Sequence, residues 1–439
     1  MNKKVHNAFA LFFLIFLGIS ASFCVYSALT SARAHVISGY DKWMKNRKVK
    51  VTQPKKKIKS PYGEKLPKKP PVVQPKKERY SKHDSKLAQS YGAVTKLMIP
   101  DQKKVERWIV DSFPFRDEFS NFNMAFKYHL NMKRPLEAKD SPMILPNHQL
   151  SQLYSVAPEV QKGRLKILLE YKKLCESEKI PFFVVYRPFS IGFHQDLYEP
   201  YKGLQVPFNR NCALRAAHLR ENGITTFELY KEMRKVIPEE KWQKYFYQSD
   251  HHWNVDGALV GSRLIADFMN RNYGTSFDLK YFDPDTYIRK RWKDLFIGSM
   301  GKKVSTSYMP DGPDDFDILY PRFKTDFTVK IPKYKYRVRK DFSAFIFGEH
   351  IFYDGYHKNP YCGFLEGNQN CWITNHKIKN GKKIVVIKDS FTRAMIPYLA
   401  LQAKEIIMLD PRHCTQKEIL KTIRREKPDI VFVMHVQLM

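Results

Sequence analysis

Residues 384–391 read I-V-V-I-K-D-S-F. The first four residues are an unbroken run of β-branched side chains, which is typical of a strand buried on both faces. The pattern continues with a predicted helix at 391–403, a strand at 405–409, a helix at 417–426 and a strand at 429–434. Strands that alternate with helices predict a parallel sheet covered by helices. Ser390 is therefore expected where a buried strand turns into a helix.

The same alternation occurs in the first half of the chain. It predicts a helix at 165–180, a strand at 181–186, a helix at 213–222, a strand at 225–229 and a helix at 254–272. Asn254 is suited to cap this last helix and Gly274 to end it. Residues 275–380 are rich in Tyr, Phe, Lys, Asp and Pro, with short alternating runs, and predict an irregular β-rich insertion.

The most distinctive motif is D-H-H-W at 250–253, just before the helix at 254–272. Asp250 and His252 are two residues apart, so in an extended segment their side chains lean to the same side. A serine hydroxyl becomes a good nucleophile when an imidazole, itself oriented by a carboxylate, accepts its proton. We therefore predict a catalytic triad of Ser390 as nucleophile, His252 as base and Asp250 as orienting group. The helix after Ser390 could also stabilise an oxyanion with its free N–H groups.

Each of these residues also has a structural explanation. Ser390 could simply cap a helix, and the histidines could be hydrogen-bonded groups without a catalytic role. The joint presence of a serine at a strand end and an Asp-His-His-Trp cluster favours the functional interpretation. Three further residues are candidates for substrate contact: His251, Arg187 and Arg412. The two arginines follow sheet strands, where they could bind an anionic sugar or pair with a carboxylate.

Several stretches together carry a resemblance to a known family. They are F-P-F-R-D-E-F at 113–119, D-H-H-W-N-V-D-G-A at 250–258, F-I-G-S-M-G at 296–301, I-V-V-I-K-D-S-F at 384–391, L-D-P-R-H at 409–413 and D-I-V-F-V-M at 429–434. From about residue 100 to its end, the chain resembles the DHHW-motif proteins. These belong with the alginate O-acetyltransferase-like group of the SGNH/GDSL hydrolase superfamily.

The resemblance implies an α/β fold, namely a flavodoxin-like three-layer α/β/α sandwich with about five parallel strands. It implies the same triad of Asp250, His252 and Ser390, and no cofactor or metal. The Asp and His precede the Ser, which is the reverse of ordinary GDSL enzymes and implies a circular permutation. An oxyanion-binding asparagine is expected after the strand at 429–434, but the chain has His435-Val436-Gln437 there. His435, Gln437 or main-chain N–H groups could donate instead.

The net charge of +32 indicates an anionic partner. Between Asp41 and Lys82 the chain has sixteen Lys and Arg against three Asp and Glu. This Lys/Pro-rich tract cannot bury a core, so we expect an extended linker at 31–84, either a spacer or a segment that binds acidic groups. The ordered domain is then expected at 85–439.

The apolar run at 8–30 is long enough to span a bilayer. We expect an uncleaved transmembrane anchor after a cytoplasmic tail at 1–7, with a cleaved signal peptide as the alternative. The catalytic domain would lie outside the cytoplasm, which disfavours nucleic acid as a partner. In that compartment Cys362 and Cys371 could form a disulfide, or they could be unrelated thiols.

These observations predict a membrane-anchored serine O-acyltransferase or esterase that acts on acetyl groups of a cell-envelope polysaccharide. The resemblance also implies a multi-pass membrane O-acyltransferase as the acetyl donor. Two alternatives are open: a catalytically inactive polysaccharide-binding scaffold, and a metal-dependent phosphoesterase, since Asp-His-His also occurs in metal sites.

Overall fold

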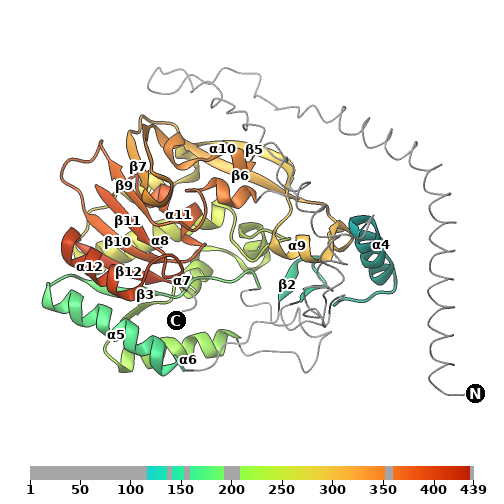
Figure 1. Cartoon of the computed structure of the whole chain (residues 1–439), viewed down its shortest axis with the longest axis horizontal. Coiled ribbons are helices and arrows are strands. Elements are labelled where there is room, and N and C mark those ends of the chain that lie inside the picture. The colour runs from blue at the N-terminus through green and yellow to red at the C-terminus, as the bar shows by residue number, and fades with distance from the viewer. Residues whose placement is uncertain are drawn as a thin grey trace, which may run out of the picture. The chain divides into compact units, whose positions relative to one another are not determined.

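The predicted strands form the centre of a mixed β-sheet (Figure 1). The computed structural model describes residues 116–134, 136, 141–152, 159–191, 208–351 and 359–435. Within these ranges, the main sheet has eight strands in the order β4-β3-β12-β10-β11-β9-β7-β8. In that order they are Thr225–Phe227, Phe182–Val185, Ile430–Met434, Lys383–Lys388, Glu405–Leu409, Cys371–Asn375, Phe327–Ile331 and Tyr336–Lys340.

The first five strands of this order run parallel. Outside the edge strand β4 their residues are almost all buried, as expected of apolar strands that have helices on both faces. In β10, Ile384 aligns with Ile406 of β11 and with Ile430 of β12. The carboxyl ends of β10, β11 and β12 therefore meet at one edge of the sheet, and Ser390 follows β10 at this edge.

Three strands from the predicted insertion continue the sheet instead of forming a separate irregular unit. β9 pairs antiparallel with β11, β7 with β9, and β8 with β7. The alternating sequence of β7 explains its place, because Phe327, Val329 and Ile331 are buried on one face. The other two strands of this region, β5 (Tyr287–Phe296) and β6 (Asp314–Pro321), form a separate antiparallel hairpin.

Helices cover both faces of the parallel strands. On one face, Val385 and Ile387 of β10 pack in a core with residues of α5, α6 and α12. On the other, Ile384 and Val386 pack with residues of α8 and α11. The main helices are α5 (Lys162–Ser177), α6 (Phe208–Glu221), α7 (Leu229–Val236), α8 (Val255–Tyr273), α11 (Thr392–Leu399) and α12 (Gln416–Glu426).

The caps of α8 agree with the sequence prediction. The side chain of Asn254 accepts hydrogen bonds from the N–H groups of Asp256 and Gly257, and Gly274 ends the helix in a left-handed conformation with φ 62°. The remaining elements are α4 (Arg116–His129), β1 (Pro142–Ile144), β2 (Leu150–Gln152), α9 (Ser299–Val304) and α10 (Gly348–Ile351). Short 3-10 turns connect several of them.

Some predictions concern residues that the structure does not describe. The tail, anchor and linker at 1–84 lie outside the described residues. None of the described helices combines the length and the apolar character needed to cross a bilayer. In α4, the side chains of Phe122 and Phe126 are exposed. The disulfide alternative for Cys362 and Cys371 is wrong, because both are free thiols and Cys371 is buried within β9.

Candidate active site

Ser390 lies in the turn between β10 and α11, with its hydroxyl available for chemistry. The neighbouring Asp389 provides the turn: its N–H donates to the carbonyl of Met434 at 2.9 Å, and its Oδ1 accepts from the N–H of Phe391 at 2.9 Å. The Thr392 hydroxyl donates to the carbonyl of Asp389 at 2.8 Å. The side chain of Asp389, and not that of Ser390, therefore accepts a main-chain N–H in this turn, while α11 itself begins without a side-chain cap.

The D-H-H-W segment forms a tight loop before α8. A β-bridge between Phe246 and Trp253 closes this loop, and the N–H of Tyr247 donates to the carbonyl of His252 at 3.1 Å. Trp253 is fully buried, and its indole N–H donates to the carbonyl of Phe391 at 3.0 Å. This bond ties the loop directly to the turn that carries Ser390, so Trp253 is a framework residue.

The structure brings Asp250, His252 and Ser390 together. Nδ1 of His252 lies 2.5 Å from Oδ1 of Asp250, and Nε2 lies 2.6 Å from Oγ of Ser390. The serine is 138 residues from the histidine in sequence. Asp250 and His252 are both buried. This is the geometry that a Ser-His-Asp triad requires, with the carboxylate at one ring nitrogen and the nucleophile at the other.

The carboxylate of Asp250 is fixed by main-chain groups from two segments. Its Oδ1 accepts from the N–H of His252 at 3.0 Å, and its Oδ2 accepts from the N–H of Ser299 at 2.6 Å. Gly298 makes the second contact possible, since a Cβ at this position would lie only 2.4 Å from the Cβ of Asp250. The F-I-G-S-M-G stretch thus supports the orienting carboxylate.

A second carboxylate, Asp314, binds the main chain just before Asp250 and so supports the loop that carries the D-H-H-W motif. It accepts from the N–H groups of Gln248 and Ser249 at 2.7 and 2.9 Å, and from the hydroxyl of Ser249 at 2.5 Å. The Ser249 hydroxyl in turn accepts from the N–H of Gly298 at 2.8 Å. Burial raises the pKa of Asp314 to about 6. The hydrogen bonds favour the ionised carboxylate and oppose this shift. Asp314 was not among the predicted site residues, because nothing in its local sequence pointed to the loop.

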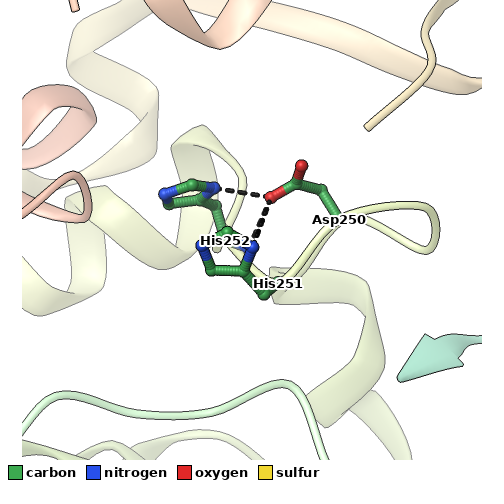
Figure 2. A group of neighbouring side chains, drawn as sticks. All are labelled: Asp250, His251 and His252. Atoms are coloured by element: carbon green, nitrogen blue, oxygen red, sulfur yellow. Dashed lines mark hydrogen bonds and ion pairs between the residues drawn. The ribbon is translucent and has the colours of Figure 1, made fainter. Parts of the chain in front are cut away.

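His251 stands beside the triad and shares its carboxylate. Figure 2 shows the two imidazole rings side by side, both directed at the same oxygen of Asp250. Nδ1 of His251 lies 3.3 Å from Oδ1, and the ring centroids of the two histidines are 3.9 Å apart. These three side chains could also be considered as metal ligands, since their ligating atoms lie within 4.8 Å of one another. However, His252 already uses both of its ring nitrogens for Asp250 and Ser390.

The electrostatics of the site keep His252 neutral. Burial, followed by the nearby charge of His251, holds the pKa of His252 well below its ordinary value of 6.5, although Asp250 opposes this. Burial works against ionisation of Asp250, but the two histidines and the hydrogen bonds hold the pKa of this carboxyl below its usual range. A neutral imidazole beside an ionised carboxylate can accept a proton at Nε2.

Tyr361 borders the imidazole and Arg393 contacts this tyrosine, and neither was among the predicted site residues. The ring of Tyr361 stacks on His252 with a centroid distance of 4.2 Å and an interplanar angle of 27°. The guanidinium of Arg393 lies over the ring of this tyrosine, 4.7 Å from the ring centroid, and its Nε donates to the carbonyl of Ser390 at 3.3 Å. Tyr361 belongs to the predicted insertion, so no local pattern could place it at the site.

The two predicted arginines, Arg187 and Arg412, lie beside carboxylates of the protein itself. Arg187 is buried between the rings of Phe189 and Phe391, and its Nε lies 3.3 Å from Oδ2 of Asp389. Arg412 forms a two-point contact with Asp410, at 2.8 and 2.6 Å. Both arginines therefore pair with a carboxylate, which was one of their two predicted roles.

Asp410 also forms an ion pair with Lys388, whose Nζ lies 3.1 Å from Oδ2 of Asp410. The side chain of Lys388 is fully buried. His435 is buried at the end of β12, and burial lowers its pKa while the charge of Asp389 opposes this. Gln437 lies outside the described residues, so the assignment of an oxyanion donor to His435 or Gln437 stays a prediction.

Residues 164–284 match a family model described as the SGNH hydrolase-like domain of the acetyltransferase AlgX. The matched segment contains Asp250 and His252 but ends before Ser390, so the pairing of the two parts comes from the geometry. No curated protein sequence matches the chain.

Solved structures of similar fold include a DHHW family protein from Eubacterium siraeum, with 16% identity over 68% of this chain and 91% of that one, and a TM-score of 0.51. PatB1 from Bacillus cereus matches with 18% identity over 68% of this chain and 96% of that one, and a TM-score of 0.54. PatB1 has also been solved with a sulfonyl adduct, a structure with 16% identity, coverage of 67% and 95%, and a TM-score of 0.51. The resemblance inferred from the sequence motifs is confirmed, and at these identities the solved structures are evidence of the fold alone.

Proposed function

We propose that this protein is a serine-dependent O-acyltransferase or esterase in which Ser390, His252 and Asp250 are nucleophile, base and orienting carboxylate. The observation that carries the proposal is the position of His252, whose two ring nitrogens lie 2.5 Å from Asp250 and 2.6 Å from Ser390. A buried imidazole that joins a carboxylate to a serine hydroxyl has the geometry of acyl-transfer chemistry.

The reaction would proceed in two half-reactions. Oγ of Ser390 attacks the carbonyl carbon of an acetyl ester while Nε2 of His252 takes the hydroxyl proton. The tetrahedral intermediate collapses, the C–O bond to the donor alcohol breaks, and His252 returns the proton to the departing oxygen. A second alcohol or water then attacks the acetyl-serine by the same proton transfers. Transfer and hydrolysis differ only in which acceptor reaches the acetyl-serine.

Each supporting residue has a defined task in this scheme. Asp250 holds the Nδ1–H tautomer of His252 and stabilises the imidazolium that forms in each half-reaction. Ser299 and Gly298 fix the rotamer of Asp250. Tyr361 covers one face of the imidazole, which limits the access of water to the base.

The topology also supports an SGNH-type fold in permuted form. If the parallel strands are counted from β10 through β11 and β12 to β3 and β4, their order in the sheet is 2-1-3-4-5, the order of flavodoxin-like sheets. The serine then follows the first strand of this count, while the Asp-His pair follows the last. A permuted chain would explain why Asp250 and His252 precede Ser390.

The substrate we propose is the acetyl group of a cell-envelope polysaccharide, delivered from a multi-pass membrane O-acyltransferase. Support comes from the acetyltransferase description of the matching family model. Further support comes from the apolar run at 8–30 and the basic tract that follows it, which would tether the domain outside the cytoplasm.

The first test is turnover of a chromogenic acetyl ester by the full-length chain in detergent, compared with Ser390→Ala. Wild type should release the chromophore, and the variant should fall to the level of buffer. Adding a soluble oligosaccharide acceptor should then divert acetyl groups from water to sugar if the protein is a transferase. Absence of turnover in wild type, together with intact binding to polymer, would instead indicate an inactive scaffold.

A further inference from the structure

Positive charge is concentrated on the strands that extend the sheet beyond the serine turn. From Lys324 to Lys340 the chain has seven Lys and Arg residues and one acidic residue, Asp326. That carboxylate is held by Arg339 at 2.9 and 2.6 Å. The local acid therefore does not neutralise Lys330, Lys333 or Arg337, all of which are exposed.

The strand register collects part of this charge on one face. Lys330 of β7 lies opposite Arg337 of β8 on one side and Trp372 of β9 on the other. Trp372 in turn aligns with Ile407 of β11, so these side chains continue the face that α5, α6 and α12 cover under the parallel strands. Over β7 and β8 the cationic side chains of this face are exposed, and Trp372 is half-buried.

The turn between β7 and β8 lies at the same edge of the sheet as Ser390. Because β9 is antiparallel to β11 and to β7, the carboxyl end of β7 lies at the edge where β10 and β11 end (Figure 1). Burial lowers the pKa of His413, which lies just beyond β11, and the positive charge of Lys333 in the turn lowers it further. Three steps between neighbouring strands separate β10 from β7, which is roughly 14 Å.

We propose that Lys330, Lys333 and Arg337, together with Trp372, form a binding surface for an acidic polysaccharide whose acetylated unit lies at Ser390. This inference rests on the proposed function. Acidic groups of the polymer would pair with the cations several sugar units away from the reacting ester, and a sugar ring would pack on the indole. The exposed ring of Tyr334, between Lys333 and Lys335 in the turn, offers a second aromatic face.

Another explanation for charge at this place is protection of a sheet edge against pairing with other chains. That explanation applies to the edge strand β8 and accounts for Arg337. It does not account for Lys330, which belongs to the inner strand β7. Trp372 packs against the core that contains Ile407, but it is only half-buried and lies beside Lys330. A binding surface explains why Lys330 and Arg337 both place a cation on the same face beside a partly exposed indole.

The test measures binding of the full-length chain to polygalacturonate, a polymer of acidic sugars, with dextran as the neutral control. The variant Lys330→Gln/Lys333→Gln/Arg337→Gln removes three charges from the surface. The control Lys162→Gln/Lys166→Gln/Lys173→Gln removes three exposed charges from α5, which packs at β3 on the far part of the sheet. A third variant, Lys330→Arg/Lys333→Arg, keeps the charge.

Wild type, the α5 control and the charge-keeping variant should bind polygalacturonate alike and dextran weakly. The three-charge variant should bind about tenfold more weakly in low salt, a difference that added salt reduces. Its turnover of a small acetyl ester should stay at the wild-type level, which shows that the fold and Ser390 are intact. Ser390→Ala should bind the polymer like wild type, so failure of the triad and failure of this surface are distinguishable.

Three outcomes would overturn the proposal. One is equal loss of binding in the α5 control, which would mean that only net charge matters. Another is undiminished binding in the three-charge variant. The third is a wild type that ignores polygalacturonate but binds vesicles of phosphatidylglycerol through Lys330 and its neighbours, which would assign the surface to a membrane.

Discussion

Gly298 is packed so tightly against Asp250 that a Cβ at this glycine would lie 2.4 Å from the Cβ of the aspartate. The added Cβ would also lie 2.4 Å from the carbonyl oxygen of Ser249. Any side chain here must push the loop that carries Asp250 away from Ser299, whose N–H holds its Oδ2. The position of the orienting carboxylate therefore depends on the absence of one methyl group.

We expect Gly298→Ala to lower kcat/KM for an acetyl ester about 100-fold, because a displacement near 1 Å in a catalytic group has this effect. The free energy of unfolding should fall by about 1–3 kcal/mol, as for other overpacked sites. Gly163→Ala in α5 is the matched control, since nothing lies within 4 Å of its added Cβ. If both variants kept full activity, the support of Asp250 by this segment would be refuted.

Asp250 and His251 can be distinguished by substitution. Asp250→Asn should lower kcat on the order of a thousandfold or more, because an amide favours the wrong tautomer of His252. His251→Gln should lower kcat less than about tenfold, since His251 touches Asp250 but not Ser390. Steady-state kinetics on a chromogenic ester measures both. Equal losses would make His251 a participant in the chemistry and contradict its assignment as a neighbour.

The dependence of activity on pH follows from the pKa of His252. The reaction needs the neutral imidazole, so kcat/KM should fall as pH falls through the pKa of this group in the free enzyme. Since burial and the charge of His251 lower that pKa, the acid limb should lie below pH 6.5. His251→Gln removes one of these causes and should move the limb upward. A limb at or above pH 6.5 in wild type would contradict the buried, neutral base.

The buried pair of Arg187 and Asp389 should contribute to stability and not to substrate binding. Both side chains are only 6% exposed and lie 3.3 Å apart. Arg187→Met leaves the carboxylate buried without its cation and should lower the free energy of unfolding by about 3 kcal/mol. The double variant with Asp389→Asn should recover part of the loss, as measured by denaturant titration. Lys235→Met, in the exposed pair with Glu232, should change stability by less than about 1 kcal/mol.

The sequence was sufficient to predict the elements whose signals are local. The β-branched run at 384–387 lies within β10, and Asn254 and Gly274 mark the ends of α8 as predicted. The helix predicted at 391–403 is shorter, Thr392–Leu399, with Pro397 in its last turn. Asp250 and His252 were identifiable because carboxylate and imidazole so close together are rare without a chemical reason.

What the sequence could not provide are contacts between distant segments. The strands β7, β8 and β9 alternate in pattern like any exposed hairpin, so nothing local showed that they extend the main sheet. Tyr361 and Asp314 reach the site through the packing of the predicted insertion, and their neighbours in sequence carry no catalytic pattern. The near contact at Gly298 likewise depends on the folded positions of two loops.

The central claim is that Ser390 is the nucleophile, and the most direct measurement is the location of its acyl adduct. Wild type and Ser390→Ala would be mixed with an activated acetyl ester, quenched in acid, digested and analysed by peptide mass spectrometry. We predict one acetyl group on Ser390 in wild type, more of it in Asp250→Asn if deacylation is slowed, and none in the peptide 389–393 of Ser390→Ala. An adduct on another residue, or equal ester turnover by Ser390→Ala, would contradict the triad.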